Sequence, residues 1–270
     1  RGCFYRHRPQ PGGSTGLFPG RRSGGSGRGR GWLQLRCQGL ALPRSLRLEP
    51  IPLTLSLPQI LQALTQFESQ PTRLEPIKVG ISASITLELL GVFLRKHAME
   101  ADLRLQILMG NYQDPLGDIE RLAQADWLIL WPFFDKLMPG FELRLASLDP
   151  AQVEAKTSEF EQLYRLVLAQ TAAFKRVFLA KFHRFSRPVW SQTADPVAAT
   201  LERFNQILER LAQQHPQVAL LDLEQVVAQV GRQAAFDPRF YYRAQAPYAL
   251  PFLDEVARRL FHLSRAFAQT

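Results

Sequence analysis

Residues 77–86 read Ile77-Lys78-Val79-Gly80-Ile81-Ser82-Ala83-Ser84-Ile85-Thr86, and this stretch decides the fold class. Its first half is a short apolar run that predicts a strand buried on both faces, and its second half turns to small and hydroxyl side chains. Apolar positions spaced as on one face of a helix follow over residues 87–99. A strand that passes through a serine-bearing turn into a helix is where α/β folds present a nucleophile or hold an anion.

The same alternation of strand and helix recurs along the rest of the chain. Further strands are expected at residues 103–108, 126–131, 177–182 and 218–222. Further helices are expected at residues 58–67, 119–124, 149–175, 195–213, 224–230 and 250–267, and loops at 110–115, 133–147, 183–194 and 237–247. Because parallel crossovers are right-handed and place helices on both faces of a sheet, we predict a three-layer α/β/α domain. Its parallel sheet should have about five strands in the order 2-1-3-4-5.

The positive charge of the chain is concentrated at one end. The 270 residues carry a formal net charge of +9, yet residues 1–48 hold ten Arg and no acidic residue. From residue 49 onward, 23 Lys or Arg stand against 24 Asp or Glu. We therefore expect residues 1–48 to be a disordered Arg/Gly-rich leader, residues 49–76 to be an extended and short-helical lead-in, and residues 77–270 to be the folded domain.

The leader has two interpretations. An Arg/Gly segment can bind nucleic acid through the release of counterions. Its lack of Lys and of any periodic pattern favours translated upstream sequence or the start of a fragment instead. No apolar segment of usable length follows its first arginines, so the pattern is not that of a signal peptide. The folded domain itself is not expected to bind nucleic acid.

The cysteine content and the absence of known motifs limit the chemistry of the domain. Both cysteines, Cys3 and Cys37, lie in the leader, so the folded domain has none. A domain without cysteine is typical of a reducing compartment, and we therefore predict a cytoplasmic location. No run approaches the roughly 18 uncharged apolar residues of a membrane span. There is no Gly-x-Gly-x-x-Gly, no P-loop lysine motif and no metal-ligand cluster, so we expect neither cofactor nor bound metal.

Three blocks of the chain together resemble a known family. Ser84-Ile85-Thr86 falls where hydrolases of the SGNH/GDSL type carry their nucleophile, with Ser82-Ala83 in place of their Gly-Asp. Together with Trp127–Trp131 and Asp237–Tyr248, this block most resembles the N-terminal domain of FkbH-type proteins, over roughly residues 75–270. The resemblance implies an SGNH-like, flavodoxin-like sheet. It also implies a role in polyketide or surface-polysaccharide biosynthesis, where such a domain precedes a HAD-type phosphatase domain.

The other catalytic blocks of SGNH enzymes are missing. Trp131-Pro132-Phe133-Phe134-Asp135 stands where those enzymes carry Gly-x-Asn-Asp. No histidine lies between His215 and His262, where Asp-x-x-His would stand, and Tyr248 is near that place. The resemblance therefore implies a degenerate domain that binds an acyl, glycan or phosphorylated metabolite, either as a small molecule or bound to a carrier. A separate HAD-type protein or an acyl carrier protein is the candidate partner. The alternative is a serine-dependent esterase or acyltransferase.

Ser84 and His183 are the candidate catalytic residues. Ser84 needs a base and an oxyanion hole to act as a nucleophile, and the alternative is that Ser84 or Thr86 caps the following helix. His183 follows the fourth strand and lies two strands from Ser84, at about 4.8 Å for each strand, so it is the histidine best placed to act as a base. The remaining histidines of the domain are expected at the surface: His97, His215 and His262.

The candidate ligand-binding residues follow the carboxyl ends of the strands. Asn111 could donate to an oxyanion, but a turn that needs Gly-Asn backbone geometry explains it equally well. Arg243 is the candidate contact for a carboxylate or phosphate, whereas Asp237 could simply pair with Arg239 and order its loop. The full set is Ser82, Asn111, Tyr112, Trp131, Asp237, Tyr242, Arg243 and Tyr248. We expect it to converge with Ser84 and His183 on one cleft, where the strand order reverses.

Overall fold

The computed structural model describes residues 55–71, 75–139, 149–185 and 195–267. The described residues all lie within one compact unit, Leu48–Thr270. The predictions made for residues 1–48 and for most of the 133–147 and 183–194 loops therefore lie outside the described residues.

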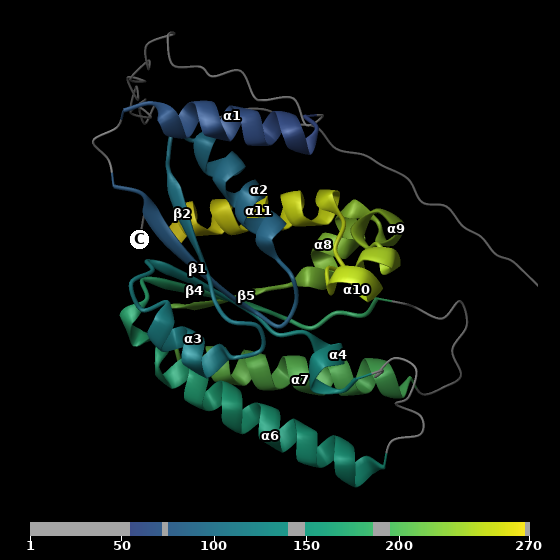
Figure 1. Cartoon of the computed structure of the whole chain (residues 1–270). Coiled ribbons are helices and arrows are strands. Elements are labelled where there is room, and N and C mark those ends of the chain that lie inside the picture. Colours follow the sequence, from purple (N-terminus) through teal and green to yellow (C-terminus); the bar gives the residue numbers. More distant parts are fainter. Residues whose placement is uncertain (1–54, 72–74, 140–148, 186–194, 268–270) are drawn as a thin grey trace, which may run out of the picture. The chain divides into compact units, whose positions relative to one another are not determined.

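One parallel sheet of five strands organises this unit (Figure 1). The strands stand in the order β2-β1-β3-β4-β5, which confirms the predicted topology. Their bounds are β1 (Ile77–Ala83), β2 (Leu105–Met109), β3 (Trp127–Trp131), β4 (Arg176–Ala180) and β5 (Val218–Leu221). Since β1 pairs with both β2 and β3, the strand order reverses at β1, where open α/β sheets bind their ligands.

Helices cover both faces of the sheet, as expected of a three-layer domain (Figure 1). One face carries α1 (Leu57–Ser69), α2 (Glu88–Met99), α8 (Leu223–Val230), α9 (Arg232–Ala235), α10 (Pro238–Ala244) and α11 (Leu250–Phe267). The other face carries α3 (Pro115–Arg121), α4 (Phe134–Leu137), α6 (Pro150–Ala169) and α7 (Pro196–Ala212), and the short 3-10 helix η3 (Thr171–Ala173) leads into β4. None of the helices in the described ranges is long and apolar enough to cross a membrane.

Two hydrophobic cores result from the period-2 alternation of side chains along the buried strands. In β3, Ile129 and Trp131 join the core under α2 and α11, whereas Leu128 and Leu130 join the core under α6 and α7. In β1, Gly80 lets α3 pack closely, because a Cβ at this position would lie 3.2 Å from the Leu122 side chain. These central strands are mostly buried on both faces, as their apolar content predicts.

Aspartate–proline pairs begin several of the helices. Asp149 accepts a hydrogen bond from the Ala151 N–H and starts α6 as predicted, although this helix ends at Ala169 rather than near residue 175. The same pair at Asp114-Pro115 starts α3, so the helix expected at 119–124 begins four residues earlier. The loop expected at 237–247 is wrong in its main part, because Asp237 caps α10. The 133–147 segment, also expected as a loop, contains α4.

Candidate functional site

The turn that carries Ser84 is fixed to two neighbouring elements. The Ser84 N–H donates to the Trp131 carbonyl at 3.1 Å, which extends the pairing of β1 with β3. The Thr86 N–H donates to the Gln245 carbonyl at 3.1 Å, and the Thr86 hydroxyl donates to the Ala244 carbonyl at 2.7 Å. The chain after β1 is therefore joined to the end of α10, although the two segments lie far apart in the sequence.

The capping interpretation of Ser84 and Thr86 is not supported. The N-cap residue of α2 is Leu87, and no side chain caps the helix there. The Thr86 hydroxyl is instead used to hold α10. Ser84 is half-buried in the turn, and no hydrogen bond joins its side chain to His183 within the described residues.

A buried chain of hydrogen bonds lies beside this turn and links β3, β4 and the segment before α11. The Trp131 Nε1–H donates to the Tyr248 hydroxyl oxygen at 3.3 Å, and this oxygen lies 2.7 Å from His183 Nε2. The side chains are 1%, 6% and 8% exposed for Trp131, Tyr248 and His183. Since an indole only donates, the Tyr248 oxygen accepts from Trp131, and the Tyr248 hydroxyl engages His183 Nε2 in either tautomer of the neutral imidazole. His183 Nδ1 has no hydrogen-bond partner among the described residues.

Burial keeps His183 neutral. It lowers the pKa of His183 to about 4, and the Arg232 guanidinium acts in the same direction. The negative charge of Asp222 acts the other way but does not outweigh burial. Burial also raises the pKa of the Tyr248 hydroxyl above its usual range. At neutral pH, the hydrogen bonds among Trp131, Tyr248 and His183 therefore join uncharged side chains, and His183 is not part of a charged catalytic pair.

Aromatic rings enclose the imidazole of His183. The ring of Phe236 stacks on it with centroids 5.3 Å apart, and Phe185 meets it edge-on at 5.1 Å. Tyr248 in turn stacks on Phe252 at 4.5 Å. These three phenylalanines were not predicted as part of the site, because each comes from a different segment and only Phe252 follows a helical apolar stripe. The wall that they form explains why the imidazole is desolvated.

Asn111 and Tyr112 belong to a turn built around a buried aspartate. The Asn111 N–H donates to Asp118 Oδ1 at 2.6 Å, and a Cβ on Gly110 would lie 2.2 Å from Asp118 Oδ2. The bond uses the Asn111 backbone alone, so the role of its exposed side chain stays a prediction, and the part played by Asp118 was not predicted from the sequence. Tyr112 is exposed, and the centroid of its ring lies 5.5 Å from Lys136 Nζ. Its hydroxyl donates to Gln245 Oε1 at 3.4 Å.

Helix α10 forms one border of the site. Asp237 caps this helix and pairs with the Arg239 guanidinium at 2.8 Å, so the ordering interpretation accounts for it. Tyr242 is 78% exposed. Arg243 is exposed and makes no ion pair with another described residue. The Tyr241 hydroxyl donates to the Asp135 carboxylate, which ties α10 to the chain after β3.

The candidate residues thus fall into an inner and an outer group. Tyr248 contacts both Trp131 and His183, and the backbone of Ser84 is bonded to Trp131. Ser82 is buried in β1 beside Leu130 of β3. Three residues lie at the exposed outer border: Tyr112, Tyr242 and Arg243.

Two cavities lie along the two edge strands of the sheet. One of about 490 Å³ is lined by residues of β2 and α2, and one of about 690 Å³ by residues of β5 and α11. Neither is lined by Ser84, His183 or Tyr248. Convergence of the candidate residues on a single cleft therefore stays a prediction.

Comparison with known proteins places this geometry in a family. The model of the FkbH N-terminal domain matches residues 78–263. The chain is similar in structure to the N-terminal part of a Bacteroides fragilis protein that contains a phosphatase domain and is complexed with Mg. The TM-score is 0.61 at 16% identity, over 75% of this chain and 55% of that one. It is also similar to a lipase from a goat rumen metagenome, with a TM-score of 0.52 at 12% identity, over 70% of this chain and 97% of that one.

At these identities, the likeness to solved structures concerns the fold alone, and the chain spans about half the length of the Bacteroides fragilis structure. No curated protein matches the chain. The family model covers more than half of the sequence and includes every strand except the first residue of β1. The chain therefore belongs to the FkbH N-terminal domain family.

Proposed function

We propose that this domain binds its ligand at the carboxyl end of the sheet without hydrolysing it. The observation that carries the proposal is the bond between His183 Nε2 and the Tyr248 hydroxyl at 2.7 Å. A serine nucleophile needs a base within hydrogen-bond reach, and His183 Nε2 is already hydrogen-bonded to the Tyr248 hydroxyl. Ser84 is then a polar contact in the turn rather than a nucleophile.

The proposed ligand is an acyl, glycan or phosphorylated metabolite used in polyketide or surface-polysaccharide biosynthesis. Membership of the FkbH N-terminal domain family supports this class. Exposed aromatic faces at Tyr112 and Tyr242 suit an apolar chain or a sugar ring. The Arg243 guanidinium, which forms an ion pair with none of the described residues, suits a phosphate or carboxylate. A free small molecule and a carrier-bound group share this chemistry.

The proposed partner is a separate HAD-type protein or an acyl carrier protein. The similar Bacteroides fragilis structure contains a phosphatase domain and extends well beyond the matched region, which supports a partner of the first kind. We propose a cytoplasmic location, because residues 49–270 contain no cysteine and cannot form the disulfides that are typical of oxidising compartments.

Binding is tested by calorimetry with phosphopantetheine and, separately, with inorganic phosphate. Arg243→Ala should weaken binding of phosphopantetheine by the roughly 1.5–3 kcal/mol of a hydrogen bond to a charged group. Arg165→Ala is the matched control, because Arg165 is an exposed arginine of α6 on the opposite face of the sheet. Equal affinities for the two variants would remove Arg243 from the site. No binding by the wild-type chain to either probe would remove phosphate from the ligand class.

The alternative function is a serine-dependent esterase or acyltransferase that uses Ser84. The position of Ser84 directly after β1, at the reversal of strand order, favours this alternative. It would require His183 to release Tyr248 and turn towards Ser84. Ester turnover by the wild-type chain, lost in Ser84→Ala, is the result that distinguishes the alternative from binding.

A further inference from the structure

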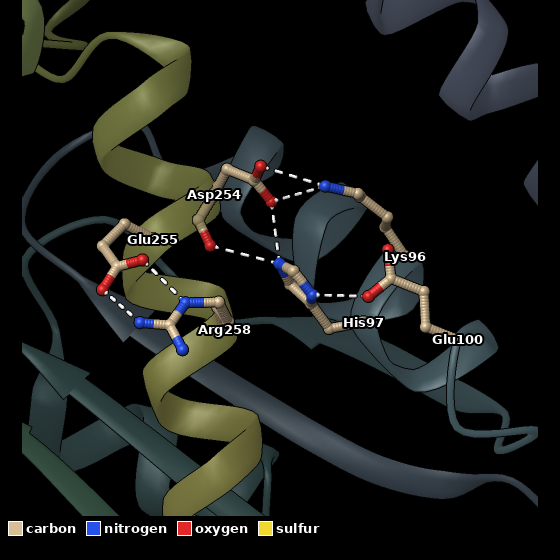
Figure 2. A network of polar contacts seen from close by, with 6 residues as sticks. All are labelled: Lys96, His97, Glu100, Asp254, Glu255 and Arg258. Carbon is tan, nitrogen blue, oxygen red and sulfur yellow. Dashed lines mark hydrogen bonds and ion pairs between the residues drawn. The ribbon is translucent and has the colours of Figure 1, made fainter. Parts of the chain in front are cut away.

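A buried group of charges joins α2 to α11, on the sheet face that carries both helices (Figure 2). Lys96 and His97, near the end of α2, are only 4% and 7% exposed. The Lys96 ammonium lies 3.0 Å from both carboxylate oxygens of Asp254, which stands near the start of α11. The expectation that His97 lies at the surface is therefore wrong, whereas His262 is exposed as expected and His215 is half-buried.

Both ring nitrogens of His97 face carboxylates. Nε2 lies 2.8 Å from Asp254 Oδ1, and Nδ1 lies 3.0 Å from Glu100 Oε2 (Figure 2). An ionised carboxylate only accepts hydrogen bonds, so both nitrogens must donate for both bonds to form. Only the doubly protonated imidazolium carries two N–H groups. The geometry therefore specifies the charged form of His97 in the folded state.

The other charged groups near His97 are already paired. Glu255 binds Arg258 at 2.7 Å on α11, and Arg95 of α2 binds Glu68 of α1 at 3.2 Å. The cluster of Lys96, His97, Glu100 and Asp254 then holds two positive and two negative charges. Burial by itself lowers the pKa of His97, but the bonds and charges of Asp254 and Glu100 outweigh it, so the pKa is raised above 6.5. Burial likewise acts to raise the pKa of Asp254, yet His97 and Lys96 lower it overall.

We propose that His97 is a pH-sensitive clasp that fastens the first turns of α11 to α2 and weakens as its imidazolium loses a proton. The neutral ring keeps only one N–H. Its other nitrogen then presents a lone pair to a carboxylate oxygen, so no hydrogen bond forms between them. Glu100 has a partly exposed side chain and can turn to water, whereas the Lys96–Asp254 pair remains. The result is a looser junction rather than a separated one.

The direction of the effect follows from the raised pKa. A group that binds its proton more tightly when folded stabilises the fold fully below its unfolded-state pKa of about 6.5. That stabilisation is lost as pH rises from about 6.5 through the folded-state pKa. The clasp is thus closed in mild acid and opens towards alkaline pH.

The clasp lies close to the candidate site along α11. Asp254 is two residues after Phe252, whose ring stacks on Tyr248 at 4.5 Å with an interplanar angle of 11°. Tyr248 in turn holds His183. A loosened start of α11 would therefore release the stacking partner of the tyrosine that occupies His183. This inference does not rest on the proposed ligand, because it concerns only how the two helices are held.

Hydrogen exchange of the α11 amides between pH 6 and 9, corrected for the intrinsic base-catalysed rate, tests the clasp. In the wild-type chain, protection of the first turns should fall about tenfold for each pH unit between 6.5 and the folded-state pKa, since one proton is released on opening. His97→Gln should remove this pH dependence. His262→Gln, which replaces an exposed histidine of the same helix, should retain it.

A second measurement decides the matter if His97→Gln does not fold. The His97 ring proton of the wild-type chain, assigned through its own backbone resonances, is followed by NMR across the same pH range. A titration midpoint above 6.5 supports the clasp. A midpoint at or below 6.5, or a pH dependence of α11 exchange that persists in folded His97→Gln, would overturn it.

Discussion

The Tyr248 hydroxyl lies 2.7 Å from His183 Nε2, and this bond occupies the nitrogen that a serine hydrolase would use as its base. The two residues are 65 positions apart in the sequence and meet in a setting that excludes water. The domain thus has a serine directly after β1, as expected, and a histidine that is hydrogen-bonded to Tyr248 rather than to that serine.

Tyr248→Phe should destabilise the domain. The change removes the oxygen that both Trp131 Nε1–H and His183 Nε2 use, so two buried polar groups lose their partner at a cost of about 1–3 kcal/mol each. Urea unfolding measures the loss. Tyr242→Phe is the control, since its side chain is 78% exposed and its hydroxyl is free to meet water. Similar stability for the two variants would show that the buried chain of hydrogen bonds contributes little.

His183 should make the domain sensitive to acid. Its folded-state pKa of about 4 lies below the unfolded value of about 6.5, so its contribution to stability is complete above 6.5 and is lost as pH falls towards 4. The contribution is at most about 3 kcal/mol, because each tenfold loss of proton affinity corresponds to about 1.4 kcal/mol. His183→Gln should flatten the pH dependence of the unfolding free energy measured between pH 4.5 and 6.5. An unchanged pH dependence in that variant would assign the acid sensitivity to carboxylates.

Gly110→Ala should lower the free energy of unfolding, although the glycine lies in a half-buried turn outside the two hydrophobic cores. The added Cβ would lie 2.2 Å from Asp118 Oδ2, and this carboxylate is fully buried and held by the Asn111 N–H and by Arg121. Thermal unfolding should show a loss of about 2 kcal/mol or more, in the range of strained or overpacked sites. Gly231→Ala is the comparison: a Cβ there meets nothing within 4 Å, and only its positive φ of 88° is strained. A smaller loss for Gly110→Ala than for Gly231→Ala would contradict the turn geometry.

The sheet could be predicted well from the sequence because its signals are local. Each strand is a short apolar run followed by turn residues, and the right-handed crossover rule then leaves few strand orders. Helix α10 begins with the same Asp-Pro pair as α6 and α7. It was not predicted because its exposed aromatic residues, such as Phe240 and Tyr242, do not form the apolar stripe that is typical of a helix.

Residues that act through distant partners could not be found in the same way. His97 reads as a surface histidine on a helix, and its burial depends on Asp254, which follows 157 positions later. His183 was found from its place after β4, whereas its engagement by Tyr248 depends on how the chain before α11 returns to the sheet. Position in the fold was therefore predictable, and the protonation state and partners of these histidines were not.

Ester turnover by the wild-type chain and by Ser84→Ala, measured side by side with p-nitrophenyl acetate and a longer acyl ester, tests the central claim most directly. If His183 is committed to Tyr248, the wild-type chain should hydrolyse neither ester faster than the variant. Turnover above background that falls by about a hundredfold or more in Ser84→Ala, as loss of a nucleophile causes, would contradict the claim and establish a serine hydrolase.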